Sequence, residues 1–246
     1  MGQDELEQSL VLIKPDALKL SLTGYILSQL SEFHTGLRLA GTKIVHLNRM
    51  LAEEHYADHR GKSFFGPLIR YIMGCVHYAD APQRRRVVAI VYSGQNAVTK
   101  IRGIVGPTSP HVARDQLPGG IRALGTVVPV KDAEGNVIAE RLDNLVHASG
   151  TIPEAEREIK LWFTPTDMMP YMRTFPTAVA QEHFYLADDR IVRSYVPGAF
   201  CLAGPGALLW QSDLEALVAL ADGRSPNRSL PSVVAKYFIN ATPESS

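Results

Sequence analysis

Apolar and polar positions along the chain form blocks with strand-like and helical patterns. The run Leu10–Ile13 is wholly apolar and is broken by Lys14-Pro15-Asp16, which predicts a buried strand that ends where polar groups are exposed. Over residues 17–33 apolar side chains recur at helical spacing, which predicts a helix. The next blocks are predicted strands over 37–47 and 86–94 and predicted helices over 50–59, 64–73 and 96–106.

The middle of the chain holds a long segment that fits neither pattern. Residues 106–125 contain several prolines and glycines, and an unpatterned segment of this length inside a compact domain is usually functional. Thr151 and Glu154 have the spacing of a capping box at the start of a helix. The elements predicted after residue 125 are a hairpin over 126–141 that turns at Glu134-Gly135-Asn136, a strand over 142–149 and a helix over 154–163.

Charge and composition narrow the classes of function. In 246 residues, 25 lysines and arginines balance 25 aspartates and glutamates, so no bulk field draws the chain to nucleic acid or to a membrane. The N-terminus lacks the regions of a signal peptide, no apolar run is long enough to span a bilayer, and Cys75 and Cys201 form no motif. We therefore expect a cytoplasmic protein that holds any anionic ligand through local clusters.

Basic and histidine residues elsewhere in the chain receive no functional role from the sequence. Arg84-Arg85-Arg86 is expected to be a solvated turn rather than a nucleic-acid site. His55, His59, His77 and His111 lack the spacing of a metal-ligand set, so we expect no metal site.

The stretch LDNLVHASGT, residues 142–151, places one histidine between Asn144 and Ser149. By itself His147 could be a core residue, a metal ligand or a nucleophile, and a lone histidine in an apolar run is most often structural. A neutral imidazole is a competent nucleophile near pH 7 if a second group holds its other ring nitrogen. The local sequence leaves these alternatives open.

Five ordered segments of the chain resemble the nucleoside diphosphate kinase family. They are VLIKPDAL, EEHYADHRGKSFFGPLIRYI, the pair GxxGPTSP and GGIRALG, NLVHAS, and EAEREIKLWF, and together they cover about residues 9–172. The resemblance implies a ferredoxin-like α/β (α+β) sandwich, with an antiparallel four-stranded sheet and helices on one face. It also implies transfer of a γ-phosphoryl group from a nucleoside triphosphate to a nucleoside diphosphate through a phosphohistidine.

The resemblance assigns a role to each matching polar residue. It makes His147 the nucleophile and Glu158 the residue that orients its ring and contacts Ser149. Phosphoryl transfer depends mainly on positioning and charge neutralisation, and an arginine can pair two phosphate oxygens at once. The remaining implied roles are Lys14 for ribose and phosphate, Tyr56 beside the transferred phosphoryl, Arg102, Arg122 and Thr108 for the phosphates, Asn144 for the sugar hydroxyl, and Phe64 and Leu68 for the base.

Two insertions and one substitution depart from the family pattern. Extra residues occur in CVHYADAPQRRR and in the hairpin near 127–141, where Arg141 and its neighbours replace the valine that usually closes the second side of the base site. Gly150 stands where the family often has an aspartate, a change expected to weaken water-mediated binding of Mg²⁺. The implied Mg²⁺ is held chiefly by the substrate phosphates.

The last part of the chain has no recognised counterpart. We therefore predict a kinase-like domain over 1–172 and an extension over 173–246 that packs on this domain or on a neighbouring subunit. The extension contains a predicted hairpin over 183–204, a helix begun by Ser212 and stopped by Gly223, and a helical segment over 232–241.

Two functions follow from these observations. The first is an active nucleoside diphosphate kinase, a homo-oligomer as is usual in the family, with nucleoside triphosphates and diphosphates as substrates. The second is a catalytically inactive nucleotide-binding or assembly module of the same fold, with the hairpin or the extension covering the cleft. The complete set of phosphate ligands favours the first, because a scaffold would not need it.

Overall fold

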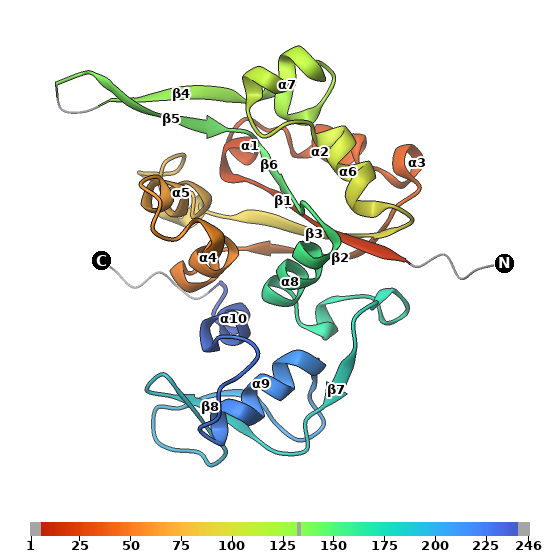
Figure 1. Cartoon of the computed structure of the whole chain (residues 1–246), viewed down its shortest axis with the longest axis vertical. Helices are drawn as coiled ribbons and strands as arrows, with labels where there is room; N and C mark the ends of the chain where they lie inside the picture. The colour runs from red at the N-terminus through yellow and green to blue at the C-terminus, as the bar shows by residue number, and fades with distance from the viewer. Residues whose placement is uncertain (1–5, 132–133, 241–246) are drawn as a thin grey trace.

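Figure 1 shows a computed structural model of the chain, which describes residues 6–131 and 134–240. At its centre is a four-stranded sheet in which neighbouring strands are antiparallel. The predicted fold class is therefore confirmed. In spatial order the strands are β2 (Arg38–Val45), β3 (Val87–Gly94), β1 (Glu7–Ile13) and β6 (Val146–Ala148).

Helices cover both faces of this sheet, rather than the one face that the resemblance implied. The side chains of β1 alternate between the faces, and those of Leu10–Ile13 are all fully buried, so each face needs a cover. Two separate hydrophobic cores result. The helices of one face are α4 (Arg49–His55), α5 (Phe65–Ile72) and α8 (Ile152–Trp162), and those of the other include α2 (Thr23–Gln29) and α6 (Ala97–Val105).

The segment predicted as one helix over 17–33 is divided into three. Ser21 has a φ of 59°, and a residue in this left-handed region cannot continue a right-handed helix. The periodic apolar pattern arose because α2 and the segments on either side of it bury apolar side chains. It could not show where the helix is broken. The three helices are α1 (Pro15–Lys19), α2 and α3 (Glu32–Thr35).

The segment predicted as irregular contains a short helix, α7 (Pro110–Gln116), and a 3₁₀ turn over Ile121–Leu124. Pro110 lies in the first turn of α7, where its missing N–H is no loss. Arg114 donates from one guanidinium nitrogen to the carbonyls of Ala123 (3.1 Å) and Gly125 (2.8 Å). These bonds tie the helix to the turn, so the segment is ordered in spite of its prolines and glycines.

The predicted hairpin is present and projects from the body of the molecule (Figure 1). It consists of β4 (Thr126–Lys131) and β5 (Val137–Asp143). Gly135 in its turn has a φ of +89°, whereas Asp132 and Ala133 of the prediction lie outside the described residues. The strand predicted over 142–149 is interrupted, because Leu145 has a φ of 69° and separates β5 from β6.

The C-terminal segment forms its own small core around Phe184, Leu209 and Leu217. The predicted helix there begins one residue before Ser212. The Ser212 hydroxyl is buried and has no hydrogen-bond partner within residues 6–131 and 134–240, so Ser212 is not its cap. Gly223, with a φ of +67°, follows the end of this helix as predicted. The elements are β7 (Thr177–Val179), β8 (Phe184–Ala187), β9 (Arg190–Val192), β10 (Phe200–Ala203), β11 (Leu208–Trp210), α9 (Gln211–Ala221) and α10 (Leu230–Val234).

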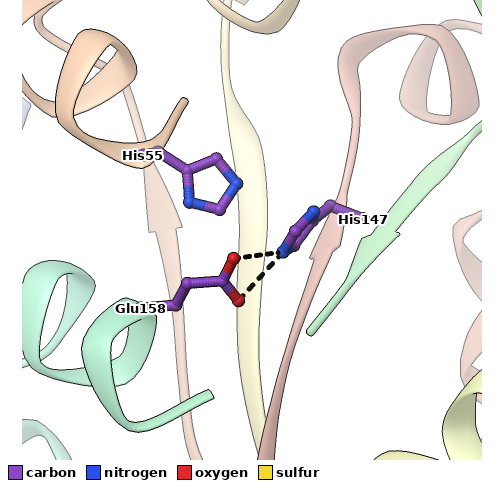
Figure 2. A group of neighbouring side chains, drawn as sticks. All are labelled: His55, His147 and Glu158. Atoms are coloured by element: carbon purple, nitrogen blue, oxygen red, sulfur yellow. Dashed lines mark hydrogen bonds and ion pairs between the residues drawn. The ribbon is translucent and has the colours of Figure 1, made fainter. Parts of the chain in front are cut away.

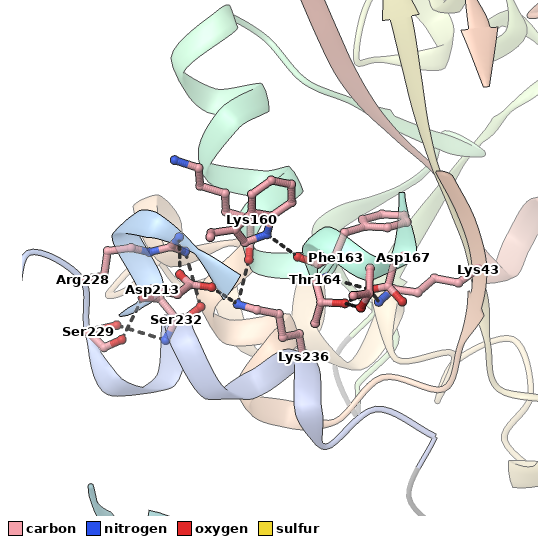
Figure 3. Close-up of polar contacts among 12 residues, drawn as sticks. Lys43, Lys160, Phe163, Thr164, Asp167, Asp213, Arg228, Ser229, Ser232 and Lys236 are labelled. Atoms are coloured by element: carbon pink, nitrogen blue, oxygen red, sulfur yellow. Dashed lines mark hydrogen bonds and ion pairs between the residues drawn. The ribbon is translucent and has the colours of Figure 1, made fainter. Parts of the chain in front are cut away.

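Buried polar contacts join this segment to the sandwich (Figure 3). The indole of Trp210 is fully buried, belongs to the core beneath α8, and donates to the Phe163 carbonyl at 2.6 Å. Lys236 is also buried and donates to the Lys160 carbonyl at 2.8 Å. Buried hydrogen bonds therefore connect the two parts of the chain.

The outer edge of β2 is contacted by two later parts of the chain. The Met169 N–H donates to the Ala40 carbonyl at 2.9 Å. Asn240 donates its side-chain amide to the Ile44 carbonyl at 3.3 Å and its backbone N–H to the His46 carbonyl at 3.1 Å. In the described part of the chain, none of the helices has the length and apolar character needed to cross a bilayer.

Candidate active site

His147 lies on β6 and faces the helices α4 and α8. In the pairing of β6 with β1, His147 stands opposite Leu12, and residues directly opposite one another share a face of the sheet. The Nε2 atom of His147 is 3.0 Å from each carboxylate oxygen of Glu158 (Figure 2). The imidazole is 18% exposed, so it is largely buried but open to a ligand.

Glu158 is held in place by α8 and by Ser149. The Thr151 hydroxyl accepts from the Glu154 N–H at 3.3 Å, but the Glu154 carboxylate accepts from Gly150 instead of Thr151, so only half of the predicted capping box forms. The Ser149 hydroxyl donates to Glu158 Oε2 at 2.6 Å, as the resemblance implied. Ser149 thus anchors the carboxylate that contacts His147.

The Glu158 carboxyl stays ionised beside the histidine. Burial acts to raise its pKa, but the neighbouring His147 and the hydrogen bonds from His147 and Ser149 outweigh burial and lower the pKa to about 2. An ionised carboxylate can only accept hydrogen bonds, so the ring nitrogen that contacts it carries the proton. In the neutral form of this ring the lone pair is then on Nδ1.

His55 is the nearest ring to His147, with 4.4 Å between the ring centroids. The Trp162 indole donates to Nδ1 of His55 at 3.2 Å, and since an indole only donates, the proton of a neutral His55 lies on Nε2. Among the described residues this buried Nε2 has no hydrogen-bond partner, and burial lowers the pKa of His55 well below its usual value. Figure 2 shows its ring pointing toward His147.

No metal site was predicted near these residues. In the described part of the chain, His55, His147 and Glu158 each offer a ligand atom, all within 4.8 Å of one another. This composition is also compatible with a metal ion. Burial is the main cause of the lowered pKa of His55, and the positive charges of Arg157 and Lys14 lower this pKa further. Such cations beside the three ligand atoms oppose the binding of a divalent metal ion.

Lys14 and Asn144 meet where β1 and β5 end. Lys14 Nζ donates to Asn144 Oδ1 at 2.6 Å, and Asn144 Nδ2 donates to the Thr108 carbonyl at 2.9 Å. Burial lowers the pKa of Lys14 to about 8, although the nearby Asp16 carboxylate opposes this effect. Three of the predicted ligands are therefore connected, and the Thr108 side chain beside them is exposed.

Arg122 is buried immediately beside the nucleophile strand. Its guanidinium donates to the Val146 carbonyl at 3.1 Å and to the Gly106 carbonyl at 3.0 Å. Burial and the nearby Arg102 lower the pKa of Arg122 to about 10, so the group remains a cation at neutral pH. Arg102 lies on α6 and is exposed.

A row of aromatic rings leads from the predicted base site to the nucleophile. Successive ring centroids are 5.5 Å apart from Phe64 to His59, 6.1 Å to Tyr56 and 4.6 Å to His55, which contacts His147. Burial raises the pKa of Tyr56, so its phenol keeps its proton. At the outer end Phe64 is 47% exposed, and the half-buried Leu68 lies one turn along α5.

Asp16 and Tyr71 also belong to the site, although no role was predicted for them. Asp16 Oδ2 accepts from the Tyr71 hydroxyl at 2.8 Å and from the Leu145 N–H at 2.9 Å. The second bond holds the left-handed backbone of Leu145 next to Asn144. The only signal in the sequence was the position of Asp16 directly after Lys14-Pro15 at the end of the first strand.

An ionised carboxylate on one nitrogen of a histidine, with buried cations nearby, is the arrangement expected of a phosphotransferase with a phosphohistidine intermediate. Comparison with known proteins agrees with this class. A family model described as nucleoside diphosphate kinase matches residues 7–168. The chain belongs to the nucleoside diphosphate kinase family.

Individual relatives give the extent of the similarity. The nucleoside diphosphate kinase of Thermococcus kodakarensis is 34% identical over 202 residues, which is 82% of this chain and 99% of the relative. That of Pyrococcus furiosus is 38% identical over 170 residues, or 69% of this chain and 91% of the relative. The solved Aquifex aeolicus enzyme has 27% identity and a TM-score of 0.53, covering 67% of this chain and 99% of that one.

Proposed function

We propose that this protein is an active nucleoside diphosphate kinase in which Nδ1 of His147 attacks the γ-phosphorus of a nucleoside triphosphate. The contact between Glu158 and Nε2 carries the proposal, because it leaves the lone pair on Nδ1 and stabilises the charge that develops on the ring. The nucleoside diphosphate then leaves, and a second nucleoside diphosphate takes the phosphoryl group from the histidine.

Cations close to the histidine support this chemistry. We assign Lys14 and the guanidinium groups of Arg102 and Arg122 to the phosphate oxygens, where they offset the negative charge on the transferring group. The exposed Thr108 hydroxyl adds a donor on the same side. Tyr56, held neutral by burial, donates a hydrogen bond beside the transferred phosphoryl group rather than accepting a proton.

We assign the nucleoside to the two ends of this arrangement. Lys14 and Asn144 hold the sugar hydroxyls through groups already fixed by their mutual hydrogen bond. The exposed face of Phe64 stacks on the base and Leu68 lines the same site. Stacking accepts any base, which is a physical reason for tolerance among nucleotides.

We place Mg²⁺ on the nucleotide phosphates. The Glu158 carboxylate is engaged by His147 and Ser149, and one oxygen of the Asp16 carboxylate accepts from Tyr71 and Leu145. Gly150 adds no carboxylate, so the protein offers few free oxygen ligands for a divalent ion there. When bound, Mg²⁺ supplies further neutralisation of phosphate charge.

The test is incubation with ATP labelled on its γ-phosphate. The wild-type protein should take up label that is lost in acid and survives in alkali, as a phosphoramidate does, and initial-rate plots should be parallel. His147→Ala should take up no label while still binding nucleotide, because Lys14 and Arg122 hold the phosphates. Acid-stable label on a serine, or transfer at the original rate by His147→Ala, would refute the proposal.

The inactive-module interpretation is not favoured by the family match, and the hairpin that could have closed the site projects away from the body (Figure 1). We further propose a domain boundary between residues 172 and 173, a homo-oligomeric assembly, and a cytoplasmic protein that binds neither nucleic acid nor membranes. The end of the family match at residue 168 and the separate C-terminal core support the boundary. The balanced charge supports the absence of polyanionic partners.

A further inference from the structure

The helix α4 lies between the active site and the C-terminal segment. Its last residue, His55, contacts the His147 ring, and the following Tyr56 contacts the His55 ring. Its opposite flank packs against α10, and Met50 contacts both the core of the sandwich and the core of the C-terminal segment. Any displacement of α4 would therefore move both rings relative to the nucleophile.

At its N-terminal end, α4 is bonded to the C-terminal segment by Asn48. The side-chain oxygen Oδ1 of Asn48 caps the helix by accepting from the Leu51 N–H at 2.7 Å. The other half of the same amide donates from Nδ2 to the Ala235 carbonyl at 2.9 Å. One side chain thus both begins α4 and joins it to the end of α10.

At its C-terminal end, α4 is bonded to the same segment by Glu54. This carboxylate is nearly buried, accepts from the Ser229 hydroxyl at 3.2 Å through Oε2, and is paired with Arg60 through Oε1. Ser229 is also the cap of α10, since it accepts from the Ser232 N–H at 3.2 Å. The two contacts with α10 and the turn after it therefore hold both ends of α4.

The end of α4 is connected to the nucleophile through Arg157. Its guanidinium donates to the backbone carbonyls of Glu54 (3.2 Å) and His55 (3.4 Å) and lies 3.8 Å from the Glu158 carboxylate. Glu158 in turn contacts His147. Ser229 is thus linked to His147 through the side chain and backbone of Glu54, the guanidinium of Arg157 and the carboxylate of Glu158.

We propose that the C-terminal segment is a positioning device for phosphoryl transfer, in which Asn48 and Glu54 lock α4 so that His55 and Tyr56 keep their places beside His147. The inference rests on the proposed function, because it concerns the same transfer step. A ring displaced by a fraction of an ångström would lower the transfer rate more than it lowers nucleotide binding, because reacting groups require tighter alignment than a bound phosphate does.

Asn48→Asp tests the first contact. Aspartate keeps the oxygen that caps α4 but replaces the donor to Ala235 by an acceptor. The single-turnover rate of labelling by γ-labelled ATP should fall by about threefold to tenfold at saturation, the fold-change that the loss of one hydrogen bond corresponds to. The ATP concentration that gives half-maximal rate should change little. Asn240→Asp is the matched control, because it removes a similar amide donor at β2 without touching α4.

Ser229→Ala tests the second contact, and Ser232→Ala is its control in the same turn of α10. The Ser232 hydroxyl donates to the Ser229 carbonyl at 2.8 Å, and in the described part of the chain no hydrogen bond joins this hydroxyl to α4. Ser229→Thr should restore the rate, because it keeps the hydroxyl that both caps α10 and reaches Glu54. If Ser229→Ala only loosened the first turn of α10, the melting temperature would fall but the labelling rate at saturating ATP would not fall selectively.

A fall in the rate of Asn48→Asp or Ser229→Ala that its control does not share supports the inference. Wild-type rates in both, or equal falls in variants and controls, would overturn it. Wild-type protein that takes up no label at all would instead refute the proposed function, so the two failures are distinguishable. If Asn48→Asp fails to fold, the two serine variants still decide the question.

Discussion

Replacing Lys236 by methionine tests how much a buried charge at the junction between the two parts of the chain lowers the free energy of unfolding. The Lys236 ammonium is 0% exposed, lies 2.9 Å from an oxygen of Asp213, and donates to the Lys160 carbonyl (Figure 3). Arg228 lies 2.9 Å from the other oxygen of Asp213, so Asp213 keeps one partner when Lys236 is replaced. Methionine has a similar length and no charge.

The magnitude follows from the pKa of Lys236. Burial lowers this pKa from its ordinary 10.5 to about 8, although the Asp213 carboxylate opposes the effect. Between these two values the unfolded chain binds the proton and the folded protein does not, so the free energy of unfolding rises with pH. At about 1.4 kcal/mol for each pH unit, the full effect is about 3 kcal/mol, of which most develops by about pH 10.

Urea unfolding of the wild-type and Lys236→Met proteins from about pH 7 to about pH 10 provides the assay. The difference between their free energies of unfolding cancels the titration of groups that both proteins share. Over this range we expect the free energy of unfolding of the wild-type protein to rise by about 2 to 3 kcal/mol relative to that of the variant. A difference that stays constant or shrinks would show that the ion pair with Asp213 outweighs burial and would refute the reasoning.

Three further predictions concern the site. Lys14→Ala should lower kcat in a coupled transfer assay by about 100-fold with the fold retained, because it removes a cation from the transferring group; near-normal turnover would contradict its role. Glu158→Gln should lower the labelling rate by about 100-fold or more, since an amide no longer stabilises a cationic ring; an unchanged rate would argue against that contact. Gly125→Ala would place a Cβ 2.5 Å from the Asp143 carbonyl and 3.1 Å from that of Arg122, so we expect a lower melting temperature and slower transfer. At Gly119 the same change meets no atom within 4 Å and should alter neither, and equal effects at both glycines would contradict this account.

The elements that the sequence predicted well are those whose cause is local. The central strand was predicted because Leu10–Ile13 is wholly apolar and buried on both faces of the sheet. The hairpin was predicted because Gly135 readily adopts the positive φ that its turn needs and that other residues rarely adopt. Residues of the candidate site were assigned through the resemblance to a family, because the local sequence alone left the role of His147 open. The pattern could not show the break at Ser21, because the apolar spacing continues across it.

The parts that were not predicted depend on packing between distant segments. His55 approaches His147 only because α4 packs beside α8, where Trp162 fixes the ring. Asp16 reaches Leu145 only because β1 and β6 are neighbours in the sheet. Trp210 looks like an ordinary apolar residue of the C-terminal segment, yet it fills the core of the sandwich. The pattern of apolar and polar residues along the sequence does not show which distant segments come into contact.

The edge of the central sheet is closed by the chain's own later segments. A bare edge strand presents unpaired N–H and carbonyl groups to which another polypeptide can add as a further strand. On β2 the carbonyls of Ala40 and Ile44 are already occupied by Met169 and Asn240. A second copy that joined the sheet here would first have to displace these residues, so the chain's own later segments oppose strand addition at the β2 edge.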